Sequence, residues 1–90
     1  MTNFNLTEAL FVRLISKLAK TFSKSEIAEV ENFLVVGEYG LALETSIAIF
    51  VEEQKLAEPT VVTLIAEIAI AMDLDPSIYI KQLQKSQGQV

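Results

Sequence analysis

Patterns that start α-helices recur along this chain of 90 residues, while patterns that start β-strands are scarce. A capping box pairs a short polar residue with a glutamate three residues later. Proline suits the first helical turn because its missing N–H has no intrahelical partner there. The capping boxes are Asn5 with Glu8 and Ser23 with Glu26, and the prolines are Pro59 and Pro76. Since Asn-Gly and Asp-Gly turns and alternating β-branched runs are absent, the chain is predicted to be all-α.

Apolar residues follow each start at helical spacing, and this spacing sets the expected helix boundaries. The helices are expected to begin near Leu6 and then to cover 24–36, 38 or 39 to 55, 59–72 and 76–85. Gly37 follows the second helix, where a left-handed residue is expected. The connections are short, which favours antiparallel neighbours, and the fourth helix is apolar in so many directions that we expect it in the middle.

Ninety residues fit one domain, so the predicted fold is a compact single-domain bundle of four to five short helices over 1–90. The ends at 1–5 and 86–90 are expected to be flexible. Gly40 and Ala42 are expected to let two helices approach closely beside a corner filled by Tyr39. The apolar stripes predict a core of Leu14, Leu18, Ile27, Leu34, Leu43, Ile47, Phe50, Leu64, Ile65 and Ile68.

The chain contains no cysteine and no histidine. Their absence removes disulfides, thiolate catalysis, the commonest metal ligand and the commonest general base. We therefore expect no catalytic activity, no cofactor and no metal site. The N-terminus lacks the basic start and apolar run of a secretion signal, and no run of about 20 apolar residues is present to span a membrane. A cytoplasmic protein without a membrane partner is expected.

Charge is unevenly placed along the sequence. Residues 26–75 carry eleven acids against Lys55 alone, whereas residues 1–25 and 76–90 have net charges of +3 and +2. Such a segment repels nucleic acid and attracts cationic surfaces, although acids also serve solubility. The first helix has a basic face, which we expect to pair with the acidic helices of the same protein rather than with RNA. That face consists of Arg13, Lys17, Lys20 and Lys24.

The third predicted helix carries the carboxylates that stand out. Glu52 and Glu53 are adjacent there, and Glu38 is expected near the same side at helical spacing. Paired carboxylates can act in acid–base chemistry when one is buried, but acids on a helix more commonly form a solvated face. Ile49 falls among Thr45 and these acids on a helical wheel, so it is a candidate anchor for a partner. The alternative is that the fifth helix or the N-terminal arm covers Ile49.

One stretch in the middle of the chain resembles a known family. Residues 29–44 read EVENFLVVGEYGLALE, with Gly-Glu-Tyr between two helices and the second helix opening with Ala-Leu-Glu. This motif resembles the MafI-type immunity proteins of bacterial polymorphic-toxin and contact-dependent growth inhibition systems. The resemblance continues through LALETSIAIFVEEQKL and TVVTLIAEIAIAMDLD, and so covers residues 29–75.

The resemblance implies a helical cytoplasmic protein that binds the C-terminal toxin domain of a neighbouring effector. In this group the toxins are often nucleases, including EndoU-like RNases. An acidic inhibitor suits such a target, because a nuclease site is basic in order to hold phosphate. Oligomeric state stays open. The expected contacts with the toxin are Glu31, Glu38, Tyr39, Glu44, Ile49, Glu52 and Glu53.

Two other functions fit the sequence less closely. Gly-Glu-Tyr followed by Ala-Leu-Glu is also similar to the turn of a tetratricopeptide hairpin, which would make the chain a small helical adaptor. That repeat needs a period of about 34 residues and about three copies, and the pattern occurs once here. An enzyme based on carboxylates is the third alternative, although the usual catalytic residue types are missing.

Overall fold

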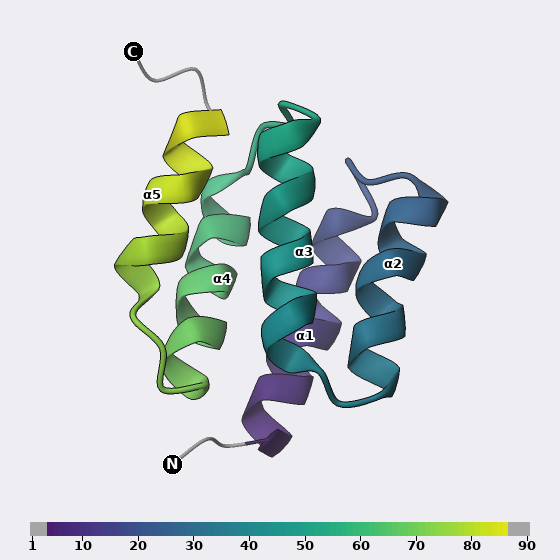
Figure 1. Ribbon diagram of the computed structural model, residues 1–90, viewed down its shortest axis with the longest axis vertical. Helices are drawn as coiled ribbons and strands as arrows, with labels where there is room; N and C mark the ends of the chain where they lie inside the picture. Colours follow the sequence, from purple (N-terminus) through teal and green to yellow (C-terminus); the bar gives the residue numbers. More distant parts are fainter. Residues whose placement is uncertain (1–3, 87–90) are drawn as a thin grey trace.

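A computed structural model of the chain describes residues 4–86, and these residues form five α-helices without a strand. Figure 1 shows the helices α1 (Phe4–Leu18), α2 (Lys24–Val35), α3 (Tyr39–Glu52), α4 (Pro59–Ala71) and α5 (Pro76–Ser86). The prediction of a small all-α bundle is confirmed. Expected tails at 1–3 and 87–90 lie outside the described residues, while residues 4, 5 and 86 are helical.

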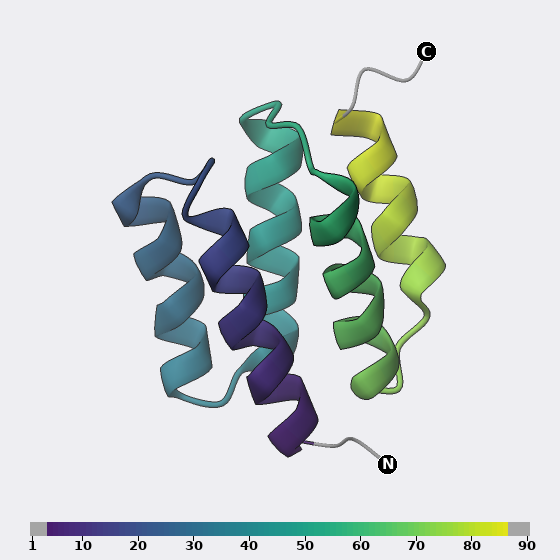
Figure 2. The same ribbon diagram turned by 180° about the vertical axis from the view of Figure 1, so that it is seen from behind.

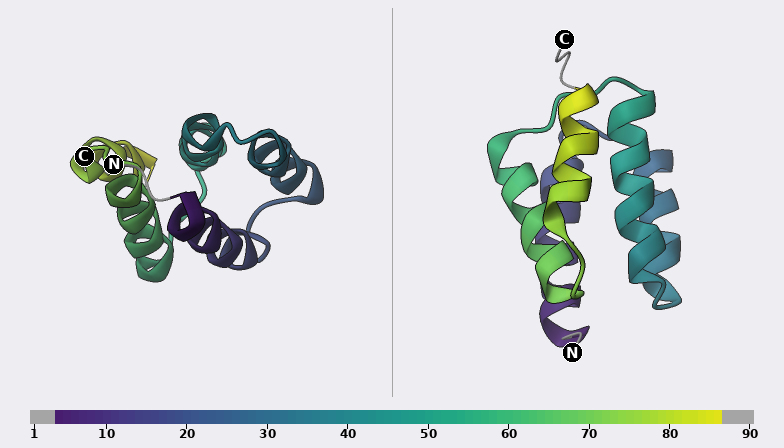
Figure 3. Two further views of the ribbon diagram at one scale, coloured as in Figure 1. Left: turned by 90° about the horizontal axis from the view of Figure 1, so that it is seen from below. Right: turned by 60° about the vertical axis from the view of Figure 1, so that its left-hand side comes forward.

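The helices alternate in direction along the chain, as Figures 1 and 2 show. Helices α2 and α3 form one antiparallel hairpin, and α4 and α5 form another. Contacts between the hairpins come mainly from α3 and α5, which run parallel, while α1 packs against α4. Seen from below in Figure 3, α1 lies between α4 and α2. Sequence neighbours are therefore antiparallel as predicted, but the main contacts between the hairpins join distant segments.

Helix α4 does not occupy the centre alone. It packs between α1 and α5, just as α3 packs between α2 and α5. Not all apolar side chains of α4 are buried, since the side chain of Ile70 is 62% exposed. The prediction of a single central helix is wrong for this reason, and α3 and α4 share the central position.

Three helices end in Schellman motifs, in which a left-handed residue follows the helix. At the end of α2, Gly37 has φ +77° and donates to the carbonyl of Leu34 at 3.0 Å, while the N–H of Glu38 reaches the carbonyl of Phe33 at 2.8 Å. Gln54, with φ +52°, follows α3 in the same way. Helix α3 therefore ends at Glu52, three residues before the predicted boundary at Lys55. Asp73, with φ +60°, ends α4.

The predicted core is buried except for two side chains of α2. Ile27 and Leu34 are partly buried, because α2 is a peripheral helix whose one fully buried side chain is Val30. Phe11 and Ala42 join the core although neither is among the predicted core positions. The rings of Phe22 and Phe50 meet edge to face at 5.0 Å between their centroids.

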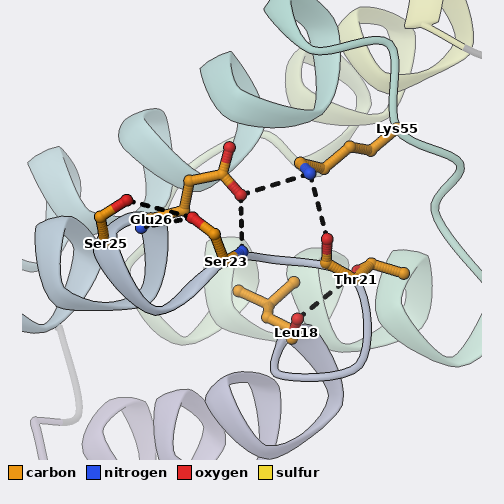
Figure 4. A network of polar contacts seen from close by, with 6 residues as sticks. All are labelled: Leu18, Thr21, Ser23, Ser25, Glu26 and Lys55. Carbon is orange, nitrogen blue, oxygen red and sulfur yellow. Dashed lines mark hydrogen bonds and ion pairs between the residues drawn. The ribbon is translucent and has the colours of Figure 1, made fainter.

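The capping box at the start of α2 is present and is tied to the α3–α4 connection (Figure 4). Ser23 N–H donates to the Glu26 carboxylate at 2.8 Å, and Glu26 N–H donates to Ser23 Oγ at 3.2 Å. Lys55 Nζ lies between the Glu26 carboxylate, at 3.2 Å, and the Thr21 carbonyl, at 3.0 Å. The backbone N–H of Ser23, followed by Lys55, holds the pKa of Glu26 below its ordinary value.

The predicted capping box of the first helix is wrong. Helix α1 begins at Phe4, so Asn5 lies inside the helix rather than ahead of it. The ring of Phe4 packs beside the ring of Tyr39, with 5.9 Å between their centroids, and this contact holds the first turn of α1 against the start of α3.

Candidate partner-binding surface

Tyr39 joins the first turns of α1 to the start of α3. Its half-buried ring stacks on the ring of Phe11 with 6.0 Å between their centroids. Its hydroxyl donates to the Glu8 carboxylate at 3.2 Å. Burial, and then the neighbouring Glu8 carboxylate, raise the pKa of Tyr39 above its ordinary value. The expectation that Tyr39 fills the corner is met, and the contact involves the Glu8 carboxylate, which the sequence analysis had assigned to a capping box.

An open groove of about 730 Å³ lies between α1 and α2 and ends at Tyr39. The two helices lie side by side (Figure 2), but their backbones come close at few positions. The groove is lined by Glu8, Phe11, Val12, Ile15, Ala28, Glu31, Asn32, Leu34, Val35 and Tyr39. We call this feature the α1–α2 groove.

The α1–α2 groove combines apolar walls with acidic edges. Val12 of α1 is 67% exposed and Val35 of α2 is 84% exposed, which is unusual for large apolar side chains on facing helices. Glu8 and Glu31 are exposed at the edges, and the lining contains no cationic side chain. An apolar centre with a charged rim is the general arrangement of a protein interface.

A smaller hollow of about 250 Å³ lies between α3 and α5. Glu44 and Glu52 line it from α3, and Gln82 and Lys85 line it from α5. Burial, and then the charge of Glu44, raise the pKa of Tyr79 on α5. Two of the predicted contact residues, Glu44 and Glu52, therefore share one face of the molecule, which we call the α3–α5 face.

Glu38 and Glu53 lie at opposite ends of α3. Glu38 is the residue that precedes the helix, and Glu53 is the residue that follows it. At about 1.5 Å per residue the two positions are separated by roughly 20 Å along the axis. The expectation that Glu38 lies near the same side of the helix as Glu52 and Glu53 concerns its side alone, since helical spacing aligns residues without bringing the two helix ends together.

Ile49 is a core residue rather than an exposed anchor. Its side chain is 8% exposed and belongs to the hydrophobic core. It falls on the same broad buried face of α3 as Ala42 and Ser46, at spacings of three and four residues. A buried side chain presents no surface to a partner, so Ile49 is withdrawn from the predicted contacts.

The basic face of α1 is not paired with acids as predicted. Within the part of the chain that the structure describes, Arg13 and Lys17 form no ion pair. Arg13 and Lys17 instead line a shallow hollow against α4, together with Glu67. The α1–α4 packing places these groups near one another without direct contact.

No group of three or more acids that could hold a metal ion occurs among residues 4–85. Within the same residues, no helix is both long enough and apolar enough to cross a bilayer.

Sequence reasoning missed Glu8, Val12 and Val35, which line the α1–α2 groove. A pattern that indicates them is present in the sequence. Val12 and Ile15 widen the apolar arc of α1 beyond its core stripe, and Ala28 and Val35 form a seven-residue repeat on the outer side of α2. Which helices face each other across these arcs is set by tertiary packing, so the groove could not be located from the pattern alone.

Comparison with known proteins found no family model, no curated protein and no solved structure that matches this chain. The resemblance of residues 29–75 to immunity proteins stays a prediction from the motif.

Proposed function

We propose that this chain is an immunity protein that neutralises the C-terminal toxin domain of a bacterial contact-dependent inhibition effector by stoichiometric binding, without catalysis. The observation that carries the proposal is the disposition of charge. Every acid from Glu29 to Asp75 is exposed, whereas Lys55, the one cation between residues 26 and 75, is held by Glu26 and the Thr21 carbonyl. The acidic half of the chain therefore faces solvent with little compensation from its own cation.

An exposed acidic surface of this kind supports binding to a basic protein. A nuclease concentrates positive potential at its active site to hold phosphate, and a carboxylate surface can occupy the same field. Complementary charge of this type raises the association rate and discriminates against wrong partners more than it adds affinity. We propose a basic nuclease domain, such as an EndoU-like RNase, as the partner.

The proposed contacts fall into two regions of the surface. Glu44 and Glu52 on the α3–α5 face, with Glu53 at the end of α3, form the first region. Glu31 and Tyr39 belong to the α1–α2 groove, with Glu38 just before Tyr39. Cytoplasmic localisation is part of the proposal, because a neutralising protein must meet the toxin where the toxin acts.

Charge reversal tests the proposal and its first region together. The double variant Glu52→Lys with Glu53→Lys changes exposed side chains, so the fold is expected to remain intact. Affinity for the C-terminal domain of the effector encoded next to this chain should fall about tenfold or more, with a slower association rate at low salt. Stopped-flow association and growth protection in cells that express the toxin domain are the measurements.

A matched control separates local contact from total charge. Glu29→Lys with Glu58→Lys makes the same change in net charge at exposed positions outside both regions. This control should bind nearly as well as the parent protein. If both double variants lose affinity equally, total charge governs binding, and if neither does, the acidic end of α3 is not the contact.

A helical adaptor is the second candidate, favoured by the open α1–α2 groove. An adaptor would bind a partner without protecting cells from a toxin, so the protection assay separates the two functions.

A further inference from the structure

The α1–α2 groove has the dimensions of a short helix face. Glu8 to Ile15 on α1 and Ala28 to Val35 on α2 each cover eight residues, or about 10 Å of helix from the first to the last. Each wall therefore offers two helical turns of side chains, and a third helix laid between two helices packs its own side chains into the space that they leave.

The openness of the groove argues against a small ligand. A small-molecule site encloses most of its ligand, whereas the walls here end in Val12 and Val35, which are 67% and 84% exposed. A side of the groove that stays open to solvent suits the apolar face of an amphipathic helix, whose polar face needs no cover.

Charge selects among helical partners. Glu8 and Glu31 stand on the α1 and α2 edges of the groove, and no lining residue carries a positive charge. A helix with lysine or arginine beside its apolar stripe meets opposite charge on both edges. A second copy of this chain, docked symmetrically through the same groove, would place Glu8 and Glu31 against like charges, which disfavours self-association there.

We propose that the α1–α2 groove docks one basic amphipathic helix of the partner protein, with apolar side chains spaced three and four residues apart seated against Val12, Ile15 and Leu34. This inference rests on the proposed function for the identity of the partner, and names the element by which the partner is held. The groove is distinct from the α3–α5 face, so its role can be tested without the toxin.

The test uses a synthetic helical peptide with leucines at positions i, i+3, i+4 and i+7 and lysines beside them, together with a copy in which glutamate replaces lysine. Fluorescence anisotropy measures affinity, and methyl NMR shifts locate the site. The lysine peptide should bind, with shifts at Val12, Ile15 and Val35. Val35→Arg should weaken binding about tenfold or more, because it blocks the wall and adds a like charge.

Matched variants make the test specific. Ile70→Arg changes an exposed apolar side chain of α4, away from the groove, and should leave peptide affinity unchanged. Glu31→Gln should weaken binding about threefold and Glu52→Gln should not, since Glu31 borders the groove and Glu52 lies on the α3–α5 face.

Three outcomes overturn the inference. They are failure of the lysine peptide to bind, equal affinity for the lysine and glutamate peptides, and equal loss in the Val35→Arg and Ile70→Arg variants. A concentration-dependent dimer that Val35→Arg dissolves would assign the groove to a second copy instead. Cell protection that persists in the Val35→Arg variant would leave the proposed function standing while rejecting the groove as its contact.

Discussion

Alanine is expected to have opposite effects at Gly37 and Gly40, which lie three residues apart around the α2–α3 turn. Gly37 has φ +77°, where an L-residue is disfavoured by about 1–2 kcal/mol. Alanine also lowers the conformational entropy of the unfolded chain, which offsets about 0.5 kcal/mol of this cost. A Cβ at Gly37 would meet no atom within 4 Å, so no clash adds to the cost. The free energy of unfolding of Gly37→Ala should therefore fall by about 1 kcal/mol.

At Gly40 the same substitution should stabilise the protein. Gly40 lies in the first turn of α3 with helical backbone, where glycine is less favourable than alanine by about 0.5–1 kcal/mol. The nearest atom to a Cβ there is Met72 Cε at 4.0 Å, which is an ordinary contact. The close approach of two helices that is expected at Gly40 and Ala42 therefore does not require glycine at position 40, and no clash should offset the stabilisation by alanine.

Urea denaturation followed by circular dichroism measures both variants against the parent protein. Gly37→Asn is the control, because asparagine tolerates the left-handed region and should cost less than alanine. A Gly37→Ala protein with the same free energy of unfolding as the parent protein would refute the left-handed conformation at Gly37. A destabilised Gly40→Ala protein would refute the open space beside α3.

Three further predictions concern polar groups. Thr7→Val should raise the free energy of unfolding by about 1 kcal/mol, because Thr7 Oγ1 is buried without a hydrogen-bond partner among the described residues; a lower melting temperature would contradict this. Lys55→Met should lower the free energy of unfolding by about 1–2 kcal/mol, because Lys55 loses its contacts with the Thr21 carbonyl, the Glu26 carboxylate and the Phe22 ring. Urea denaturation measures this loss, and the exposed substitution Lys20→Met should have little effect on the same measurement. Stability should be nearly flat from about pH 6 to 9 without histidine. The free energy of unfolding should fall as the pH drops below 4.5, because Glu26 has a lowered pKa in the folded state and loses its stabilising contribution on protonation. An equally steep loss of stability at acid pH in the Glu26→Gln variant would contradict this.

Features set by local chemistry were predictable from the sequence. Ser23 and the two prolines start their helices where predicted, since a capping side chain and a missing N–H act within one turn. The end of α3 was not predictable, because Gln54 takes a left-handed conformation that glycine normally marks. The Lys55 contact joins residues more than thirty positions apart, and no local pattern indicates it.

The residues of the candidate surface also include some that could be predicted from the sequence and some that could not. Exposure of Glu31, Glu44, Glu52 and Glu53 follows from their polarity and is present in the structure. Ile49 was misplaced because a helical wheel assumes a narrow core stripe, whereas α3 buries a broad face against two neighbouring helices.

Calorimetric titration of this protein with the C-terminal domain of the effector encoded beside it tests the central claim most directly. Our account predicts a one-to-one complex of about nanomolar affinity or tighter, weakened by salt because both surfaces are charged. No heat of binding with a folded and active toxin domain would contradict the claim that this acidic helical protein is its inhibitor.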